Sequence, residues 1–212
     1  NGTAATENVE LWPDQASFLG VGVSATADNV EVLSATSGGG GDRVTLFGGD
    51  GVDTLTIDGG VATMTGPTVD HQASGFAEYF AYGRRGDNDV VHLYGGPGAD
   101  EFVVTSQYGG MYLQDYVVHT RFFDDVRGYS DAAGGDTAKF YDGPNDDTFT
   151  SEPDSVSMTG EYMGVPFVRQ ADDFIRVYAW ATGGGNDVAH MYDGPGRDEF
   201  LSTTAEAMWI GA

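Results

Sequence analysis

The stretch GDNDVVHLYGGPGADEF, residues 86–102, decides the fold of this chain because it recurs. Its three other copies are GGGGDRVTLFGGDGVDTL (residues 38–55), AGGDTAKFYDGPNDDTF (residues 133–149) and GGGNDVAHMYDGPGRDEF (residues 183–200). Self-similarity at a fixed period is typical of repeat architectures, in which each unit packs only on its neighbours. We therefore expect a scaffold that repeats one glycine-rich, acidic corner.

The spacing of the aspartates defines the repeat. In every copy a first aspartate is followed 11 residues later by a second, and successive first aspartates lie 47, 47 and 51 residues apart. The four extra residues of the third unit fall between Asp147 and Gly183. The flanks repeat in part, since Glu7 to Gly20 is similar to Asp147 to Gly160. We expect a single domain over residues 1–212, made of a partial repeat, three repeats and a second partial repeat (1–37, 38–84, 85–131, 132–182 and 183–212).

Composition and charge narrow the class of protein. The 212 residues include 33 glycines and no cysteine, and 33 acidic against 9 basic residues give a formal net charge of -24. Such a surface repels phosphate backbones and anionic membranes, so we expect neither a nucleic-acid partner nor membrane insertion. No apolar run approaches the length of a transmembrane helix. The charge either attracts neutralising cations or keeps the chain soluble in a salty medium, and both readings stay open.

Alternating apolar residues after each first aspartate predict short β-strands. Val44 and Leu46 point one way and Thr45 the other, and the same alternation places His92, Lys139 and His190 outward. Four strands per unit allow a parallel β-solenoid, β-helix or β-roll in type, or alternatively a β-propeller. We favour the solenoid because the second and third strands occur five times and the first and fourth four times, as in an open stack. Equivalent inward residues would then form a ladder: Leu55, Phe102, Phe149 and Phe200.

Two of the corners match the pattern G-G-x-G-x-D-x-U-x, namely GGDGVDTLT (residues 48–56) and GGPGADEFV (residues 95–103), and two others are near matches. They resemble the calcium-binding nonapeptide of the RTX β-roll family. The resemblance implies calcium held by turn carbonyls and aspartate carboxylates. RTX nonapeptides follow one another directly, whereas these corners are at least 47 residues apart, so shared ions would require neighbouring coils to stack. The implied ligands are the second aspartates, Asp53, Asp100, Asp147 and Asp198, and beside them the first aspartates, Asp42, Asp89, Asp136 and Asp187.

A purely structural role for these aspartates is the alternative. Aspartate in a glycine-rich turn commonly accepts a hydrogen bond from nearby backbone, and glycine adopts positive φ at little cost. Proline fills one equivalent turn position in three units, at residues 97, 144 and 195. The residue pattern alone leaves both readings open.

The whole repeat also resembles tandem arrays in very large secreted or surface proteins of aquatic bacteria. This resemblance rests on the composite GGxDxAx[LM]YDGPGxDxF and covers nearly the whole chain. It implies an extracellular scaffold, passenger or appendage segment, secreted or on the cell surface. Because an open repeat exposes strand edges that can pair with another chain, we expect the chain to self-associate end to end into a fibre, filament or stalk.

No catalytic group stands out. His71, His92, His119 and His190 are the four histidines, and the chain has no cysteine nucleophile, no G-x-S-x-G elbow and no phosphate loop. We therefore expect no enzyme and no catalytic residue, with calcium as the one cofactor. A calcium-dependent module that binds glycans or proteins stays open as an alternative, and a polysaccharide lyase or hydrolase comes behind it.

Two further features bear on an extracellular role. Aromatic residues occupy two equivalent sets of positions and would either stack to lock a corner or present rings to sugars. The sets are Phe47, Tyr94, Tyr141 and Tyr192, and Tyr82, Tyr129 and Trp180. Asn1 begins the single N-x-[ST] triplet and is a candidate glycosylation site.

Overall fold

The computed structural model describes residues 6–20, 23–30, 32–131, 134–192, 194, 199–202 and 207–210, the last two ranges as backbone only. These residues form 22 β-strands, arranged in one sheet of 12 strands and another of 10. Within the described ranges, no helix is long and apolar enough to cross a membrane.

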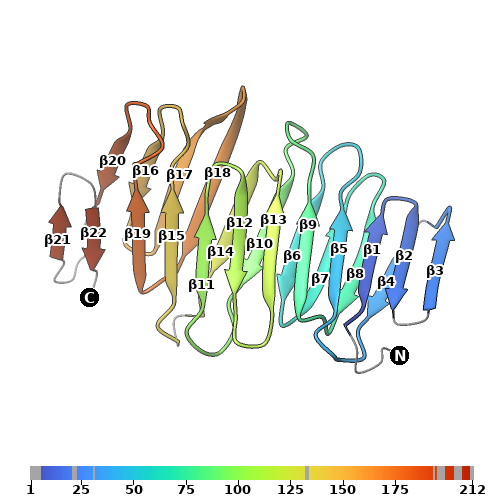
Figure 1. The fold of residues 1–212 in the computed structure, drawn as a ribbon. Helices are drawn as coiled ribbons and strands as arrows, with labels where there is room; N and C mark the ends of the chain where they lie inside the picture. Colours follow the sequence, from blue (N-terminus) through green and yellow to red (C-terminus); the bar gives the residue numbers. More distant parts are fainter. Residues whose placement is uncertain are drawn as a thin grey trace.

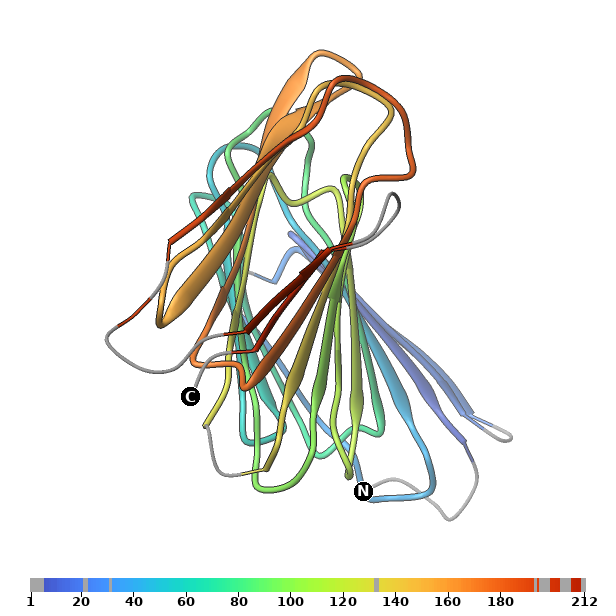
Figure 2. The same cartoon turned by 90° about the vertical axis from the view of Figure 1, so that its left-hand side faces the viewer.

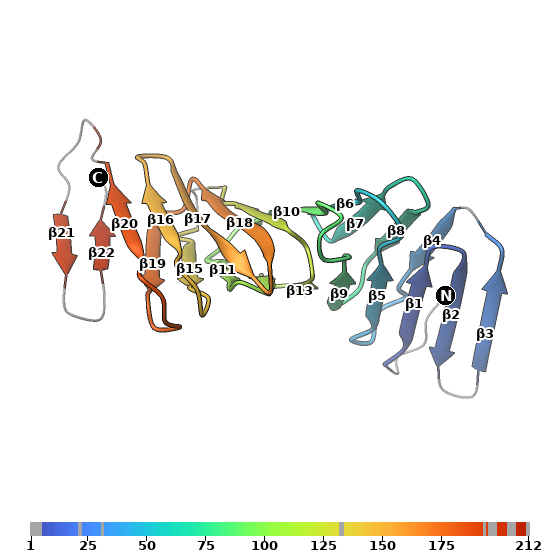
Figure 3. The same ribbon diagram turned by 90° about the horizontal axis from the view of Figure 1, so that it is seen from above.

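The two sheets face each other and form an open rod, with the chain termini at opposite ends (Figure 1). The view along the rod shows the two sheets as the walls of a flattened wedge (Figure 2). From above, successive units follow one another along the rod in the order of the chain, while the three strands of each meander run in the reverse order (Figure 3). The stack amounts to about five turns of a β-solenoid. The predicted all-β solenoid is confirmed, and the propeller alternative is wrong because the stack does not close into a ring.

Sheet A contains the strands at both ends of the described chain. Its order is β21-β22-β19-β15-β11-β12-β13-β9-β5-β1-β2-β3. The bounds are β1 (Asn8–Trp12), β2 (Gln15–Gly20), β3 (Val23–Asp28), β5 (Arg43–Phe47), β9 (Glu78–Tyr82), β11 (Glu101–Val104), β12 (Tyr108–Tyr112), β13 (Val117–Arg121), β15 (Thr137–Tyr141), β19 (Arg176–Trp180), β21 (Glu199–Ser202) and β22 (Ala207–Ile210).

Sheet B covers the inner face of sheet A. Its order is β20-β16-β17-β18-β14-β10-β6-β7-β8-β4. The bounds are β4 (Leu33–Thr36), β6 (Thr54–Asp58), β7 (Val61–Thr65), β8 (Asp70–Ser74), β10 (Val90–Tyr94), β14 (Asp125–Tyr129), β16 (Thr148–Ser151), β17 (Ser155–Tyr162), β18 (Val165–Asp172) and β20 (Val188–Met191).

Each complete unit has five strands: a first strand in one sheet, an antiparallel meander of three in the other sheet, and a last strand back in the first sheet. The units are β5–β9, β10–β14 and β15–β19. The prediction of four strands per unit is therefore wrong. The strand it missed is the third of each meander, because this strand turns polar residues inward and so lacks the apolar alternation: His71 in β8, Thr120 in β13 and Arg169 in β18.

Because five is odd, successive units start in opposite sheets. Leu55 and Phe149 lie in sheet B, whereas Phe102 lies in sheet A. All three are buried, as predicted, but they do not stack coil over coil, so that expectation is wrong. Their parallel neighbours are residues of first strands, Val91, Ala189 and Ala138. Phe200 lies in β21 of sheet A, and its side chain falls outside the described residues.

Parallel pairs join successive coils, while antiparallel pairs lie within the meanders, apart from β22, which pairs antiparallel with β19. Inward residues of the first strands, such as Val44 and Leu46, are completely buried. Their outward neighbours Thr45, His92 and Lys139 are partly exposed and His190 is exposed, as the alternation predicted. The core is thus a continuous apolar layer between the two sheets.

Two buried polar side chains interrupt this layer. Arg169 is 1% exposed, and its guanidinium donates to the carbonyl oxygens of Thr105, Ser106, Asp124 and Val168 at 2.8–3.0 Å. Burial lowers the pKa of Arg169 to about 10. His71 is fully buried, and neither ring nitrogen has a hydrogen-bond partner among the described residues. Burial lowers the pKa of His71, so its ring is neutral in the folded state near pH 7.

Candidate functional site

The acidic corners meet in pairs at the starts of neighbouring parallel strands. Each first aspartate directly precedes a first strand, and each second aspartate precedes the first strand of a meander. The second acid of one unit lies beside the first aspartate of the next unit, and Glu7 takes the place of a second aspartate. These four acid pairs are Glu7 with Asp42, Asp53 with Asp89, Asp100 with Asp136, and Asp147 with Asp187.

One hydrogen bond recurs in all four acid pairs. The backbone N–H of the second acid donates to Oδ1 of the first aspartate at 2.8–2.9 Å. The two residues are 35 to 40 positions apart in the chain, so the bond ties one coil to the next. Hydrogen bonds to an ionised carboxylate are about twice as strong as neutral ones. The first aspartates therefore fix the stacking of coils.

The other oxygen of the first aspartate holds the preceding turn. Ser37 Oγ donates to Asp42 Oδ2 at 2.6 Å, and Ser130 Oγ donates to Asp136 Oδ2 at 2.7 Å. At Asp89 the backbone N–H of Arg84 takes this role. Both oxygens of these three carboxylates therefore accept hydrogen bonds from the protein.

The second aspartates close their own corners. Their Oδ2 atoms accept the backbone N–H of the glycine four residues earlier: Gly49 to Asp53 at 2.6 Å, Gly96 to Asp100 at 2.7 Å, and Gly143 to Asp147 at 2.6 Å. This is the turn bonding expected of aspartate beside glycine. The glycines of the matched nonapeptides thus serve as donors to the aspartate.

The second oxygen of two of these aspartates lies against glycine. Oδ1 of Asp53 and Oδ1 of Asp147 are buried and have no hydrogen-bond partner among the described residues. A Cβ atom on Gly66 would lie 1.7 Å from Asp53 Oδ1, and one on Gly160 would lie 1.7 Å from Asp147 Oδ1. Both glycines follow their aspartate by 13 residues, the position that Leu113 holds after Asp100. Only a residue without a side chain fits over these two carboxylates.

Burial governs the acidity of these groups. Asp53 and Asp89 are completely buried, and Asp100 and Asp147 nearly so. Desolvation raises the pKa of all four carboxyls, and the N–H donors of the corners only partly offset it. Neighbouring carboxylates raise the pKa of Asp53, Asp100 and Asp147 further. The ionised carboxylates of the acid pairs are therefore destabilised by burial, and protonation or a bound cation would reduce this cost.

One group of carboxylates has the oxygen donors that calcium uses. Carboxylate oxygens of Asp142, Asp147 and Asp187 all lie within 4.8 Å of one another. Asp142 accepts the N–H of Gly183, and Asp187 accepts the N–H of Asp147, but Oδ1 of Asp147 has no hydrogen-bond partner among the described residues. Calcium takes six to eight oxygen ligands, and this donor set fits part of such a shell. We call these three residues the aspartate triad. Asp147 and Asp187 were predicted ligands, whereas Asp142 was not. Asp198, also a predicted ligand, lies outside the described residues, as does Asn1, the candidate glycosylation site.

No protein-family model, no curated protein and no solved structure matches this chain. What the corners do must therefore follow from their own geometry.

The predicted aromatic sets meet in stacked pairs. Rings of Phe47 and Tyr82, Tyr94 and Tyr129, and Tyr141 and Trp180 lie 4.6–5.3 Å apart and nearly parallel. The pairs alternate between sheets A, B and A, as the acid pairs do. Because each ring covers the face of its partner, the arrangement agrees with the corner-locking interpretation.

The histidines are not gathered into one site. Near the outer surface, His92 Nδ1 contacts the hydroxyl of Tyr129 at 2.9 Å, and His119 Nδ1 contacts the hydroxyl of Tyr108 at 2.8 Å. His71 is buried in the core and His190 is exposed. Each lies on a different strand, and no pair of them shares a carboxylate in the manner of a catalytic dyad among the described residues.

Sequence reasoning missed Asp142 of the aspartate triad and the hydrogen-bond and packing partners of the predicted aspartates. Gly66, Gly160, Ser37 and Ser130 all contact an acid pair. The spacing of 13 residues from acid to glycine, visible in the repeated flanks, is the signal that could have identified the two glycines. The serines carry no spacing signal, because Arg84 replaces them in the unit between.

We predict that Gly66→Ala destabilises the fold. The new methyl group must displace the Asp53 carboxylate and so break its bond from Gly49, at a cost of about 2–4 kcal/mol. Chemical denaturation measures the free energy of unfolding. Gly96→Ala is the matched control, since its Cβ would meet only Leu113 Cδ2 at 3.5 Å. Equal stability of the two variants would contradict the assigned packing.

We also predict a pH signature at Asp53. Its folded-state pKa is raised above that of the unfolded chain, so its ionisation destabilises the native state at neutral pH. As pH falls through the folded pKa toward 3.8, the native protein should gain stability relative to Asp53→Asn, which cannot titrate. Unfolding free energies at several pH values between 7.5 and 4 measure this difference. Exposed Asp14→Asn serves as control, and a pH-independent difference at Asp53 would refute the prediction.

Proposed function

We propose that this chain is a non-enzymatic structural protein of the cell exterior, a rod segment that assembles end to end into a surface fibre, filament or stalk. The observation that carries the proposal is that the rod carries unpaired strand edges at both ends. In the described residues, β3 and β4 each pair on one side only, and so do β20 and β21. Unpaired edges are templates for pairing with another chain.

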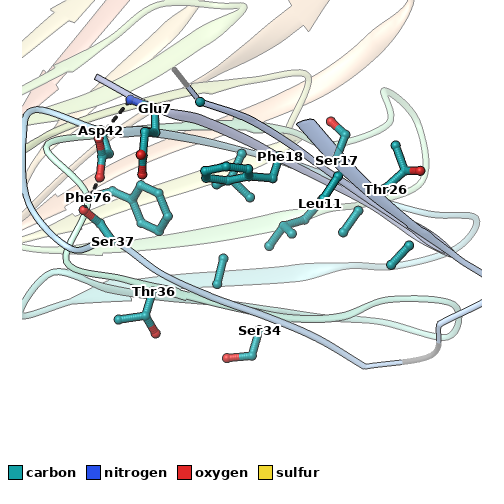
Figure 4. A pocket seen from close by; sticks show the side chains of 16 residues that line it. Glu7, Leu11, Ser17, Phe18, Thr26, Ser34, Thr36, Ser37, Asp42 and Phe76 are labelled. Carbon is teal, nitrogen blue, oxygen red and sulfur yellow. Dashed lines mark hydrogen bonds between the residues drawn. The ribbon is translucent and has the colours of Figure 1, made fainter. Parts of the chain in front are cut away.

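The end formed by β3 and β4 is also open between the sheets. A cavity of about 490 Å³ lies there, lined by apolar residues of the inner faces, and the acid pair of Glu7 and Asp42 lies at one side (Figure 4). Leu11, Phe18 and Phe76 are among the lining side chains, and Ala25 and Ala27 of β3 line it while still exposed. A neighbouring coil would cover this apolar surface, as coils do throughout the rod.

The alternatives draw less support from the geometry. A glycan-binding surface needs exposed ring faces, but the equivalent aromatic rings stack on one another in pairs. A lyase or hydrolase needs two carboxylates facing a substrate cleft, whereas the acid pairs are buried and hydrogen-bonded to backbone. Calcium binding would suit the scaffold role, because the ion would neutralise carboxylates that the fold has buried.

The assembly proposal predicts that Ala25→Asp blocks end-to-end association. An inward-pointing charge on an edge strand is a known barrier to strand addition, and Ala25 is exposed, so the fold itself should be preserved. Ser24→Asp, on the opposite face of the same strand from Ala25 and outside the cavity lining, is the matched control and should still assemble. Sedimentation velocity over a range of concentrations, with electron microscopy, measures the outcome. A strictly monomeric parent protein at high concentration, with calcium present, would overturn the proposal.

The calcium proposal predicts a stability increase that depends on the aspartate triad. An ion that binds only the folded state stabilises it by roughly 2.7 kcal/mol at a hundredfold excess over its Kd. Calcium should therefore raise the Tm of the parent protein above its value in chelator, and by less in Asp187→Asn. Asp154→Asn, an exposed aspartate outside the triad, is the control. Identical melting curves in calcium and in chelator would remove the ion from the proposal.

A further inference from the structure

The four extra residues of the third unit lengthen one hairpin. Its strands β17 and β18 have eight residues each, whereas β7 and β8 of the first unit have five. Figure 1 shows this hairpin reaching beyond its neighbours at one edge of the rod. Its tip crosses to an earlier unit, where the Tyr162 ring lies 4.7 Å from the Arg85 guanidinium. The insertion thus builds one wall of a site that the other units lack.

The tip of the hairpin carries a residue that its backbone does not favour. Met163 and Gly164 form the two-residue loop between β17 and β18, with φ values of 53° and 82°. A loop of the same length in a different hairpin, between β6 and β7, has glycine at both places, with φ values of 54° and 74°. Such two-residue turns prefer Asn-Gly or Gly-Gly, because the left-handed region is costly for bulky side chains. The Met163 side chain is nevertheless 75% exposed. Neither its backbone nor burial explains a methionine here.

A second residue breaks the same rule nearby. The position after the last meander strand is left-handed in every unit and is held by Asn29, Gly75 and Asp173, but in the second unit by Phe122 at φ 66°. Asn, Gly and Asp are the residues that tolerate this conformation. Phe122 is also 39% exposed. Strained backbone under an exposed apolar side chain is typical of binding sites.

Arg85 lies between these two irregular segments. Its guanidinium is 5.5 Å from the ring of Phe122 and 4.7 Å from that of Tyr162. It has no ion pair or hydrogen bond among the described residues, although the chain has 33 acidic residues against 9 basic ones. The adjacent Arg84, by contrast, pairs with Asp50. Rings over the guanidinium fix its plane and leave its N–H edge for an oxyanion.

Arg85, Phe122 and Met163 line one open cleft of about 660 Å³, together with Gly83, Arg84, Asp87 and Gln107. Methionine, aromatic rings and arginine are the side chains enriched at interaction sites. The cleft therefore combines an apolar surface, an oriented guanidinium and the Gln107 amide, which can bond to a peptide backbone.

We propose that this cleft binds a segment of a partner protein that presents a carboxylate beside an apolar side chain. Arg85 accepts the carboxylate in a bidentate pair, and Met163 and Phe122 pack on the apolar side chain. The net charge of -24 opposes an acidic partner at long range, but salt screens charges beyond about 8 Å. A uronate sugar fits less well, because its hydroxyl groups would face Met163 and Phe122. This site is independent of end-to-end assembly.

Matched peptides test the chemistry. The 15N-labelled chain is titrated with Ac-Gly-Glu-Phe-Gly-NH2, with the Gln analogue Ac-Gly-Gln-Phe-Gly-NH2 and with Ac-Gly-Glu-Ser-Gly-NH2, following the amide signals of Gln107 and Gly86. Loss of the charge should weaken binding about tenfold, and loss of the ring should weaken it as well. A tetragalacturonate titration examines the sugar alternative. Equal affinity for the Glu and Gln peptides, no shift at millimolar peptide, or tighter binding of the uronate would each overturn the proposal.

Variants separate binding from folding. Arg85→Gln should abolish the preference for Glu over Gln, whereas Arg43→Gln should retain it because Arg43 is paired with Glu78 and lies outside the cleft. Met163→Asn supplies the residue that the turn prefers, so it should raise the Tm while weakening the phenylalanine peptide. A Met163→Asn variant of lower Tm and unchanged affinity would show that Met163 is structural and would overturn its assigned role.

Discussion

The odd number of strands in each unit is the constraint on which this structure depends. A unit that used an even number would return every equivalent residue to the same sheet, and the rod would have two different walls. Five strands instead send each unit to the opposite wall, so the acid pairs and the stacked aromatic pairs appear on both sheets in turn. The two walls are thereby chemically alike. The structural period is two sequence repeats, and each coil contacts the next through parallel strands whose ends carry the acid pairs.

The acid pairs show why a chain so rich in carboxylates can bury several of them. An isolated buried carboxylate would be prohibitively costly, and the raised pKa values of Asp53 and Asp89 record the part of this cost that remains. Part of this cost is offset by backbone N–H groups that donate to the carboxylate oxygens from the same corner and from the neighbouring coil. These donors would themselves be unsatisfied if the aspartates were apolar. The carboxylates and the turns therefore depend on each other, and losing either leaves buried polar groups without partners.

Features with a regular spacing, such as the strands and the repeated aspartates, could be predicted from the sequence. Features that break the regular pattern, such as the third strand of each meander, could not. Regular alternation around Val44 and Leu46 identified the strands and their inward faces correctly. The third meander strand was missed because the polar side chains of His71 and Arg169 point inward. No local sequence pattern shows that four backbone carbonyl oxygens accept hydrogen bonds from the guanidinium of Arg169. The alternation of successive units between the two sheets was missed for the same reason, because it depends on whether the number of strands per unit is odd or even. The repeated aspartates were found by their period, but the N–H groups that donate to Oδ1 of the first aspartates belong to residues 35 or more positions away.

Residues that depart from the repeat pattern in one unit indicate a role other than stacking. In a solenoid, selection for stacking acts alike on every unit, so a residue that violates the common backbone requirement in one unit alone needs a cause outside the stacking. Phe122 violates it at a position that asparagine, glycine or aspartate holds in the other described units, and Met163 holds a left-handed turn position that favours asparagine or glycine. The two lie on the same cleft although 41 residues separate them in the chain. The inserted residues that lengthen β17 and β18 bring Met163 there. A random loss of turn preference would have no reason to converge on Arg85, which lies between two aromatic rings. The convergence is therefore better explained by a ligand than by drift of a scaffold.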